Sequence, residues 1–125
     1  MRHVVVSVFA ACASLVPAPV AAQPISEAFV ECAVLVDLSY SAMPLHRDTV
    51  PGTGLDYAAR QLMSGAELAA RREGHADVPA YLDRIGRAKR HAWRAEGTRF
   101  VFTTAFRNWM GYCDKLAQSR DIALR

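Results

Sequence analysis

Two short His-x-Asp sequences in this chain have residue types that could bind a metal. They are His46-x-Asp48 and His75-x-Asp77, and Met43 lies close to the first. Imidazole and carboxylate groups are ordinary zinc ligands, and a thioether suits copper. Loop histidines without a fixed ligand spacing are more often solvated residues or helix caps. The sequence therefore assigns no metal or cofactor, and His46 and His75 stay as weak candidates.

A second group of candidate residues has the types used in acid, base or nucleophilic chemistry. Glu27 and Glu31 lie four residues apart, the spacing at which two carboxylates share a helix face. Such a pair usually lies on a solvated helix face, and we interpret it in that way. Ser39, Ser41 and Ser64 have no neighbouring sequence typical of a catalytic triad. These residues do not predict an enzyme.

Sequence motifs of several enzyme and cofactor classes are absent from the chain. It contains no Cys-x-x-Cys-His, His-Glu-x-x-His or Gly-x-Ser-x-Gly sequence and no phosphate-binding glycine loop. Haem attachment, zinc proteolysis and nucleotide binding thus have no support in the sequence. We leave the question of enzymatic activity open and favour a non-catalytic protein.

Basic residues are concentrated in one segment. The whole chain has 15 Lys and Arg against 12 Asp and Glu, which is too small an excess to indicate nucleic-acid binding. From Arg84 to Arg99, however, the chain contains six Lys and Arg residues and only one Glu. On a helix, four of the side chains recur at three- or four-residue spacing and form a basic ridge, with Lys89 and Arg90 flanking it: Arg84, Arg87, His91 and Arg94.

The basic ridge predicts a contact with an anionic partner. Outside the cytoplasm this would be an acidic protein patch or the anionic head groups and polymers of the cell envelope. The alternative interpretation is a solvated face that keeps the protein soluble. The candidate partner-binding residues are Arg84, Arg87, Arg90 and Arg94.

The first 22 residues have the layout of a secretory signal peptide. Arg2 and His3 precede an apolar run from Val4 to Val16, which at 13 residues is shorter than the roughly 20 of a membrane span. We expect cleavage after Ala22, so that residues 23–125 form a single periplasmic or secreted domain without a transmembrane segment. Acylation of Cys12 is the alternative fate of this leader. The composition rich in Ala and Arg suggests a bacterial source.

Removal of the leader leaves an even pair of cysteines, Cys32 and Cys113. In an exported chain such a pair is expected to form a disulfide. Closing a loop of this length would stabilise the fold by about 4.5 kcal/mol in the chain-entropy model. The alternative is two unbonded core cysteines.

Hydrophobic periodicity predicts an all-α fold. Ser26 is placed to cap the first helix, and Pro44 ends it. Further turn and cap residues predict three more helices, over residues 53–74, 77–97 and 98–117, although residues 78–117 could instead form one long kinked helix. The fourth helix is expected to bury Phe102, Phe106, Trp109, Cys113 and Leu116 on one face.

The cysteine pair and the helix order support one topology. Val34, Leu35 and Leu38 widen the apolar surface of the first helix beyond one stripe, which predicts a central position or an outside contact. In an up-and-down bundle the first and last helices are antiparallel neighbours, so Cys32 and Cys113 should meet. We expect a small antiparallel bundle of three to four helices that follows a cleaved signal peptide and is closed by one disulfide.

Two functional hypotheses follow from the sequence. The first is an exported, non-catalytic binding or accessory protein that uses the basic ridge or the wide first helix as its contact surface. The second is a metal-binding or enzymatic periplasmic factor that uses His46, His75 and His91. The sequence identifies neither the partner nor the oligomeric state.

Overall fold

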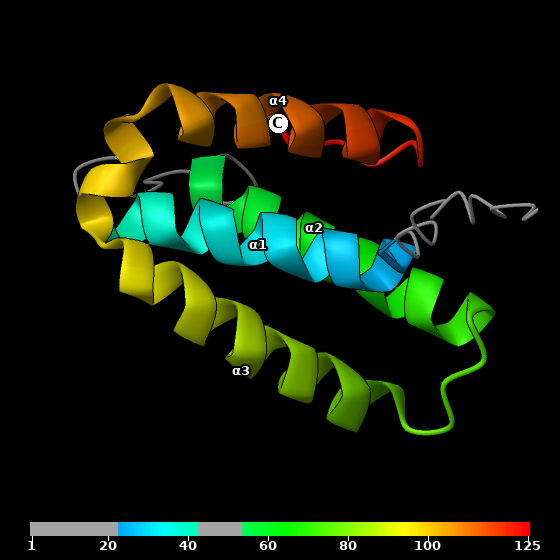
Figure 1. Cartoon of the computed structure of the whole chain (residues 1–125). Helices are drawn as coiled ribbons and strands as arrows, with labels where there is room; N and C mark the ends of the chain where they lie inside the picture. Colours follow the sequence, from blue (N-terminus) through cyan, green and yellow to red (C-terminus); the bar gives the residue numbers. More distant parts are fainter. Residues whose placement is uncertain (1–22, 43–53) are drawn as a thin grey trace, which may run out of the picture.

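The computed structural model describes residues 23–42 and 54–125, and within these ranges the chain forms helices and no strand. Successive helices run in opposite directions (Figure 1). The expected all-α antiparallel bundle is therefore confirmed, while the predicted leader lies outside the described residues. The elements are α1 (Ile25–Ala42), α2 (Gly54–Arg72), α3 (Val78–Glu96), the 3-10 helix η2 (Thr98–Phe102) and α4 (Thr104–Gln118).

Helix α1 occupies the centre of the bundle. Eleven of its 18 residues are buried, and they point to every side of the helix. Helices α2, α3 and α4 each pack against it (Figure 1). The wide apolar surface around Val34 and Leu35 thus indicated a central helix, as one of the two predicted alternatives required.

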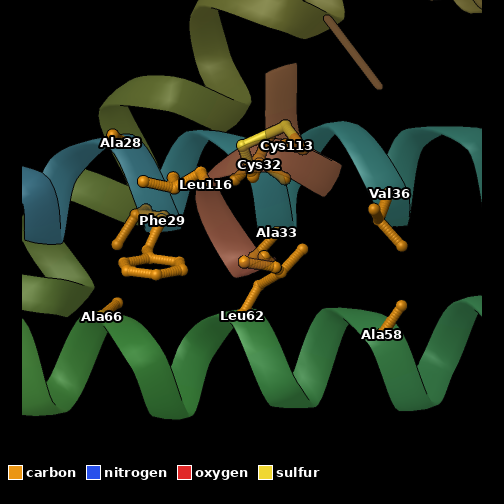
Figure 2. Close-up of a cluster of buried hydrophobic side chains, with 13 residues drawn as sticks. Ala28, Phe29, Cys32, Ala33, Val36, Ala58, Leu62, Ala66, Cys113 and Leu116 are labelled. Carbon is orange, nitrogen blue, oxygen red and sulfur yellow. A yellow bond between two sulfur atoms is a disulfide. The ribbon is translucent and has the colours of Figure 1, made fainter. Parts of the chain in front are cut away.

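The largest part of the core lies between α1 and α2 (Figure 2). Phe29 of α1 and Leu62 of α2 are almost completely buried, and small residues such as Ala66 allow the two helices to approach closely. At Gly65 a Cβ atom would lie 2.6 Å from Cδ1 of Ile122 and 3.0 Å from Cε1 of Phe29. Ile122, in the segment that follows α4, therefore packs closely against a glycine of α2.

A disulfide joins α1 to α4. Cys32 and Cys113 are both buried, and their Cα atoms lie 5.6 Å apart (Figure 2). The predicted pairing of the first and last helices is confirmed. The bond links residues 81 positions apart in the sequence, which removes a large loop entropy from the unfolded chain.

Cap residues set the boundaries of α3. Asp77 accepts a hydrogen bond from the backbone N of Ala80 at 3.1 Å, and Pro79 lies in the first turn, as predicted. Gly74, which follows the end of α2 and precedes α3, has a φ of +83°, a left-handed conformation that favours glycine after a helix. Gly97, at φ +78°, ends α3 in a similar way.

The connection between α3 and α4 corrects the sequence prediction. Residues 98–102 form a 3-10 helix, and Thr103 caps α4 by accepting a hydrogen bond from the N of Phe106 at 3.2 Å. The alternative of one long helix over residues 78–117 is wrong, because the chain turns at Gly97. Phe102, which was expected in the core, is 66% exposed because η2 changes the phase of the helix.

Candidate functional site

The four candidate arginines all lie on α3, in two different environments. Arg87 forms an exposed ion pair with Asp83, one turn earlier on the same helix. The guanidinium carbon of Arg84 lies 5.7 Å from the centre of the Tyr81 ring. An exposed ion pair such as that of Arg87 with Asp83 stabilises a helix by only about 0.3–0.5 kcal/mol. Arg90 and Arg94 instead line a surface depression.

That depression consists of two adjoining hollows of about 470 and 170 Å³. Val34, Asp37 and Arg90 line both hollows, and we treat them together as the arginine-lined groove. The wider part lies between α1, α2 and Arg90, and the narrower part between α1 and α3. The lining residues are Val30, Ala33, Val34, Asp37, Leu38 and Ser41 of α1, Ala59, Arg60, Met63 and Ser64 of α2, and Arg90, Trp93, Arg94 and Thr98.

Apolar side chains supply much of the groove surface. Leu38, Ala59 and Trp93 are half-buried, and Met63 is 36% exposed. A volume of this order falls within the range of ordinary ligand sites. The groove can therefore remove a few apolar side chains of a bound partner from water.

The charged groups of the groove are of one predominant sign. Arg60, Arg90 and Arg94 contribute guanidinium groups, and Asp37 contributes one carboxylate. Arg60 pairs with Asp56 of its own helix. Within residues 23–42 and 54–125, no ion-pair partner is found for Arg90 or Arg94. Among these residues, the charges of Arg90 and Arg94 are therefore not neutralised by an ion pair.

Gly86 makes room for the Arg90 side chain. Gly86 is buried, and a Cβ atom there would lie 3.2 Å from Nη1 of Arg90. The guanidinium therefore lies against the preceding turn of α3, where a larger side chain would displace it.

The neighbouring residue, Lys89, instead joins a buried ion cluster between α3 and α1. This cluster is centred on Glu31, which is only 8% exposed. Its carboxylate accepts hydrogen bonds from Nε2 of Gln23 at 2.9 Å, Nζ of Lys89 at 3.2 Å and Nε1 of Trp93 at 3.1 Å. Three donors of different chemical type thus satisfy one buried anion.

Glu27 completes the buried ion cluster. Its Oε1 lies 2.9 Å from Nζ of Lys89. Burial works to lower the pKa of Lys89, but the hydrogen bonds and charges of Glu27 and Glu31 outweigh it, so this pKa lies above its ordinary value. Our interpretation of Glu27 and Glu31 as a solvated face is wrong, because Lys89 and Trp93 of α3 cover them. Lys89 likewise does not flank an exposed ridge.

A second polar cluster fixes the start of α1. Glu73 accepts a hydrogen bond from the backbone N of Ser26 at 3.0 Å and another from its hydroxyl, which also lies 2.9 Å from the hydroxyl of Tyr81. His75 stacks on Tyr81 at 3.6 Å, and its Nε2 lies 3.3 Å from Glu73. The prediction that Ser26 caps α1 is wrong, since the helix begins at Ile25 and Ser26 anchors it from within.

The contacts of Ser26 do not form a hydrolytic site. Its hydroxyl is bonded to a carboxylate and a phenol instead of an imidazole, and the residue is 0% exposed. Burial acts to raise the pKa of Glu73, but the hydrogen bonds from Ser26 and the contact with His75 hold it below its ordinary value. The cluster therefore stabilises the junction of α1, α2 and α3.

The histidines do not come together in the described part of the chain. His46 lies outside the described residues, His75 belongs to the Glu73 cluster, and His91 is exposed on α3. Residues 23–42 and 54–125 contain no group of three or more His, Cys, Asp or Glu that is placed to hold a metal. Within the same ranges, every helix is too short or too polar to cross a bilayer.

The sequence contained partial signals for these sites. The four-residue spacing of Glu27 and Glu31 was visible, but the choice of Lys89 over the adjacent Arg90 as their partner depends on how α3 is rotated. No local pattern linked Ser26 to Glu73, which lies 47 residues away. Comparison of the chain with protein-family models, curated proteins and solved structures found no match.

Proposed function

We propose that this protein is an exported, non-catalytic binding protein that holds an acidic partner in the arginine-lined groove. One observation carries the proposal: Arg90 and Arg94 have no ion-pair partner among the described residues, and they lie beside the apolar surface formed by Leu38, Met63 and Trp93. A guanidinium that is free to make paired hydrogen bonds recognises carboxylate well. The adjacent apolar surface adds the contact area that a charge alone does not provide.

The arrangement unites the two surfaces that the sequence singled out. The basic segment contributes Arg90 and Arg94, and the wide first helix contributes Val34 and Leu38. The other two candidate arginines already interact within α3, Arg87 with Asp83 and Arg84 with Tyr81. We therefore assign the main contact to the groove and not to the outer part of the basic ridge.

Export is supported by the leader-like first 22 residues and by the disulfide between Cys32 and Cys113. Disulfides of this kind persist in oxidising compartments and are rare in the cytosol. Intact-mass measurement of the protein purified from its own cells tests this part of the proposal. A chain that begins at Gln23 and gains two hydrogens on reduction is expected, whereas a full-length chain recovered from the cytosol would contradict export.

The groove is tested by a matched pair of charge reversals on α3. Tagged protein is recovered from cells at low ionic strength, and bound partners are eluted with salt. We expect Arg90→Glu combined with Arg94→Glu to reduce the salt-eluted partner at least tenfold. Arg84→Glu combined with Arg87→Glu makes the same change in net charge outside the groove and should retain the partner within about twofold.

Circular dichroism and urea unfolding of both variants establish that each is folded. Equal retention by the two variants would contradict the proposed function. Loss in the Arg84 and Arg87 variant alone would move the contact to the outer part of the basic ridge. Either result removes the groove from the account.

A further inference from the structure

The shape of the arginine-lined groove points to a class of partner. Its floor follows α1 from Val30 to Ser41, a distance of about 16 Å or three helical turns. Met63 of α2 lines one side, and Trp93 of α3 lines the other. Helical elements thus form the floor and the sides of a depression that is about as long as three turns of a further helix.

Both the polar and the apolar groups of the groove fit a helix that has two faces. Such a helix can place an apolar stripe against Leu38 and Met63 and keep its polar face in water. A hydrocarbon chain is apolar on all sides, so part of it would stay in contact with water in a depression that is open to solvent. Helical partners are therefore favoured over acyl chains.

The two arginines of the groove define the spacing expected of acidic residues on a partner helix. Arg90 and Arg94 lie one turn apart on α3, with no ion-pair partner in the described chain. Acidic side chains that lie four residues apart on a partner helix have the same repeat and can meet both guanidinium groups. Asp37 of α1, which is exposed and lines the groove, favours a hydrogen-bond donor or a basic side chain opposite it. A uniformly anionic ligand such as a phosphate backbone would be repelled there.

We propose that the arginine-lined groove binds an acidic amphipathic helix of a partner protein, with acidic residues four positions apart over Arg90 and Arg94 and apolar residues over Leu38 and Met63. This inference rests on the proposed function and specifies the chemistry of its partner. The groove either induces the helix in the partner segment or holds a helix that has already formed.

The test is a selection from a random peptide display library whose members are long enough for three to four helical turns. The immobilised protein with its disulfide intact is the target, and the Arg90→Glu/Arg94→Glu variant removes peptides that bind elsewhere. Enriched peptides are then synthesised and titrated by Trp fluorescence. Circular dichroism of the mixtures measures helix formation.

We expect enriched peptides to carry apolar residues at three- and four-residue spacing and two acidic residues four apart. Their affinity should fall at least tenfold for the Arg90→Glu/Arg94→Glu variant or when both peptide acids become amides. The Arg84→Glu/Arg87→Glu variant should bind them within about twofold. Extended, proline-rich or basic peptides, or no enrichment over the variant, would overturn the helix inference.

Lipid is tested in the same format with dodecyl phosphate as the probe. Saturable binding of dodecyl phosphate that requires Arg90 and Arg94, without helical peptides, would also overturn the inference. In that outcome the proposed function survives, because an acidic ligand still occupies the groove. If neither peptide binding nor capture from cells depends on Arg90 and Arg94, both proposals fail together.

Discussion

Lys89 and Arg90 are adjacent basic residues that have different surroundings in this fold. The Lys89 ammonium group lies within 3.2 Å of two carboxylates of α1, and its side chain is only 20% exposed. The Arg90 guanidinium lies over Gly86 at the edge of an open groove and has no ion-pair partner in the described chain. A helix turns by about 100° per residue, so neighbouring charges face different surroundings.

This difference separates residues that hold α1 in place from residues to which we assign binding in our proposal. On the Lys89 side, each buried polar group has a partner inside the protein, and removing one partner leaves a charge that water cannot reach well. On the Arg90 side, the guanidinium has no ion-pair partner among the described residues, so replacing it leaves no buried charge unpaired. Mutations on the first side should change the free energy of unfolding, and mutations on the second side should change affinity.

The largest expected effect is loss of the disulfide, which joins α1 to α4 outside the groove. Replacing both Cys32 and Cys113 with Ala should lower the free energy of unfolding by about 2–5 kcal/mol, because the unfolded chain regains the entropy of a long loop. Urea unfolding of the oxidised protein and the double variant measures this difference. A change below about 1 kcal/mol would show that the helices hold α1 without the bond.

Matched substitutions of Lys89 and Arg90 compare most directly how much each residue contributes to the free energy of unfolding. Lys89→Met leaves Glu27 and Glu31 without their ammonium partner and should lower the free energy of unfolding by about 2–3 kcal/mol. This is less than for a fully buried pair, since the side chains retain some exposure. Arg90→Met on the other side should change it by less than about 1 kcal/mol. Equal losses in urea unfolding would refute the distinction between the two residues.

The Glu73 cluster should make the free energy of unfolding depend on pH. Because the folded pKa of Glu73 is lowered, its stabilising effect is complete above the ordinary pKa near 4.5 and is lost as the pH falls through the lower folded value. Glu73→Gln should therefore reduce the difference in unfolding free energy between about pH 7 and about pH 3. Glu67→Gln, at an exposed pair with Arg71, serves as the control and should leave that difference nearly unchanged. The same pH dependence in wild type and Glu73→Gln would exclude this role.

The smallest expected effect concerns Gly86. Gly86→Ala should raise the free energy of unfolding by up to about 1 kcal/mol through helix propensity, since the flexible end of Arg90 can move away from the added methyl group. Capture of the partner should stay within about threefold of wild type. A loss of stability above about 1 kcal/mol would mean that Arg90 is held rigidly against Gly86, contrary to a guanidinium that is free to meet a partner.

Local patterns in the sequence predicted those features that depend on a few adjacent residues. Asp77 and Pro79 indicated the start of α3, and the apolar surface widened by Val34, Leu35 and Leu38 indicated a central helix or an outside contact. Cys32 and Cys113 could be paired because they are the two cysteines that follow the predicted leader. These inferences needed only periodicity, capping chemistry and an even count of cysteines.

Contacts set by helix rotation could not be predicted in this way. Glu31 was assigned to a solvated face because its spacing from Glu27 does not reveal that Trp93 lies over it. The 3-10 turn at residues 98–102 shifted the phase of α4 and exposed Phe102. Likewise, the sequence placed Arg94 in the basic ridge and Arg90 only beside it, and the packing of α3 on α1 is what brings the two together in the groove. Long-range packing decides each of these cases.

The most direct test of the account measures stability and binding on the same variant, Arg90→Glu combined with Arg94→Glu. We predict that its free energy of unfolding in urea stays within about 1 kcal/mol of wild type, while salt-sensitive capture of the partner falls at least tenfold. A loss of more than about 2 kcal/mol, or capture equal to wild type, would contradict the assignment of these two arginines to binding.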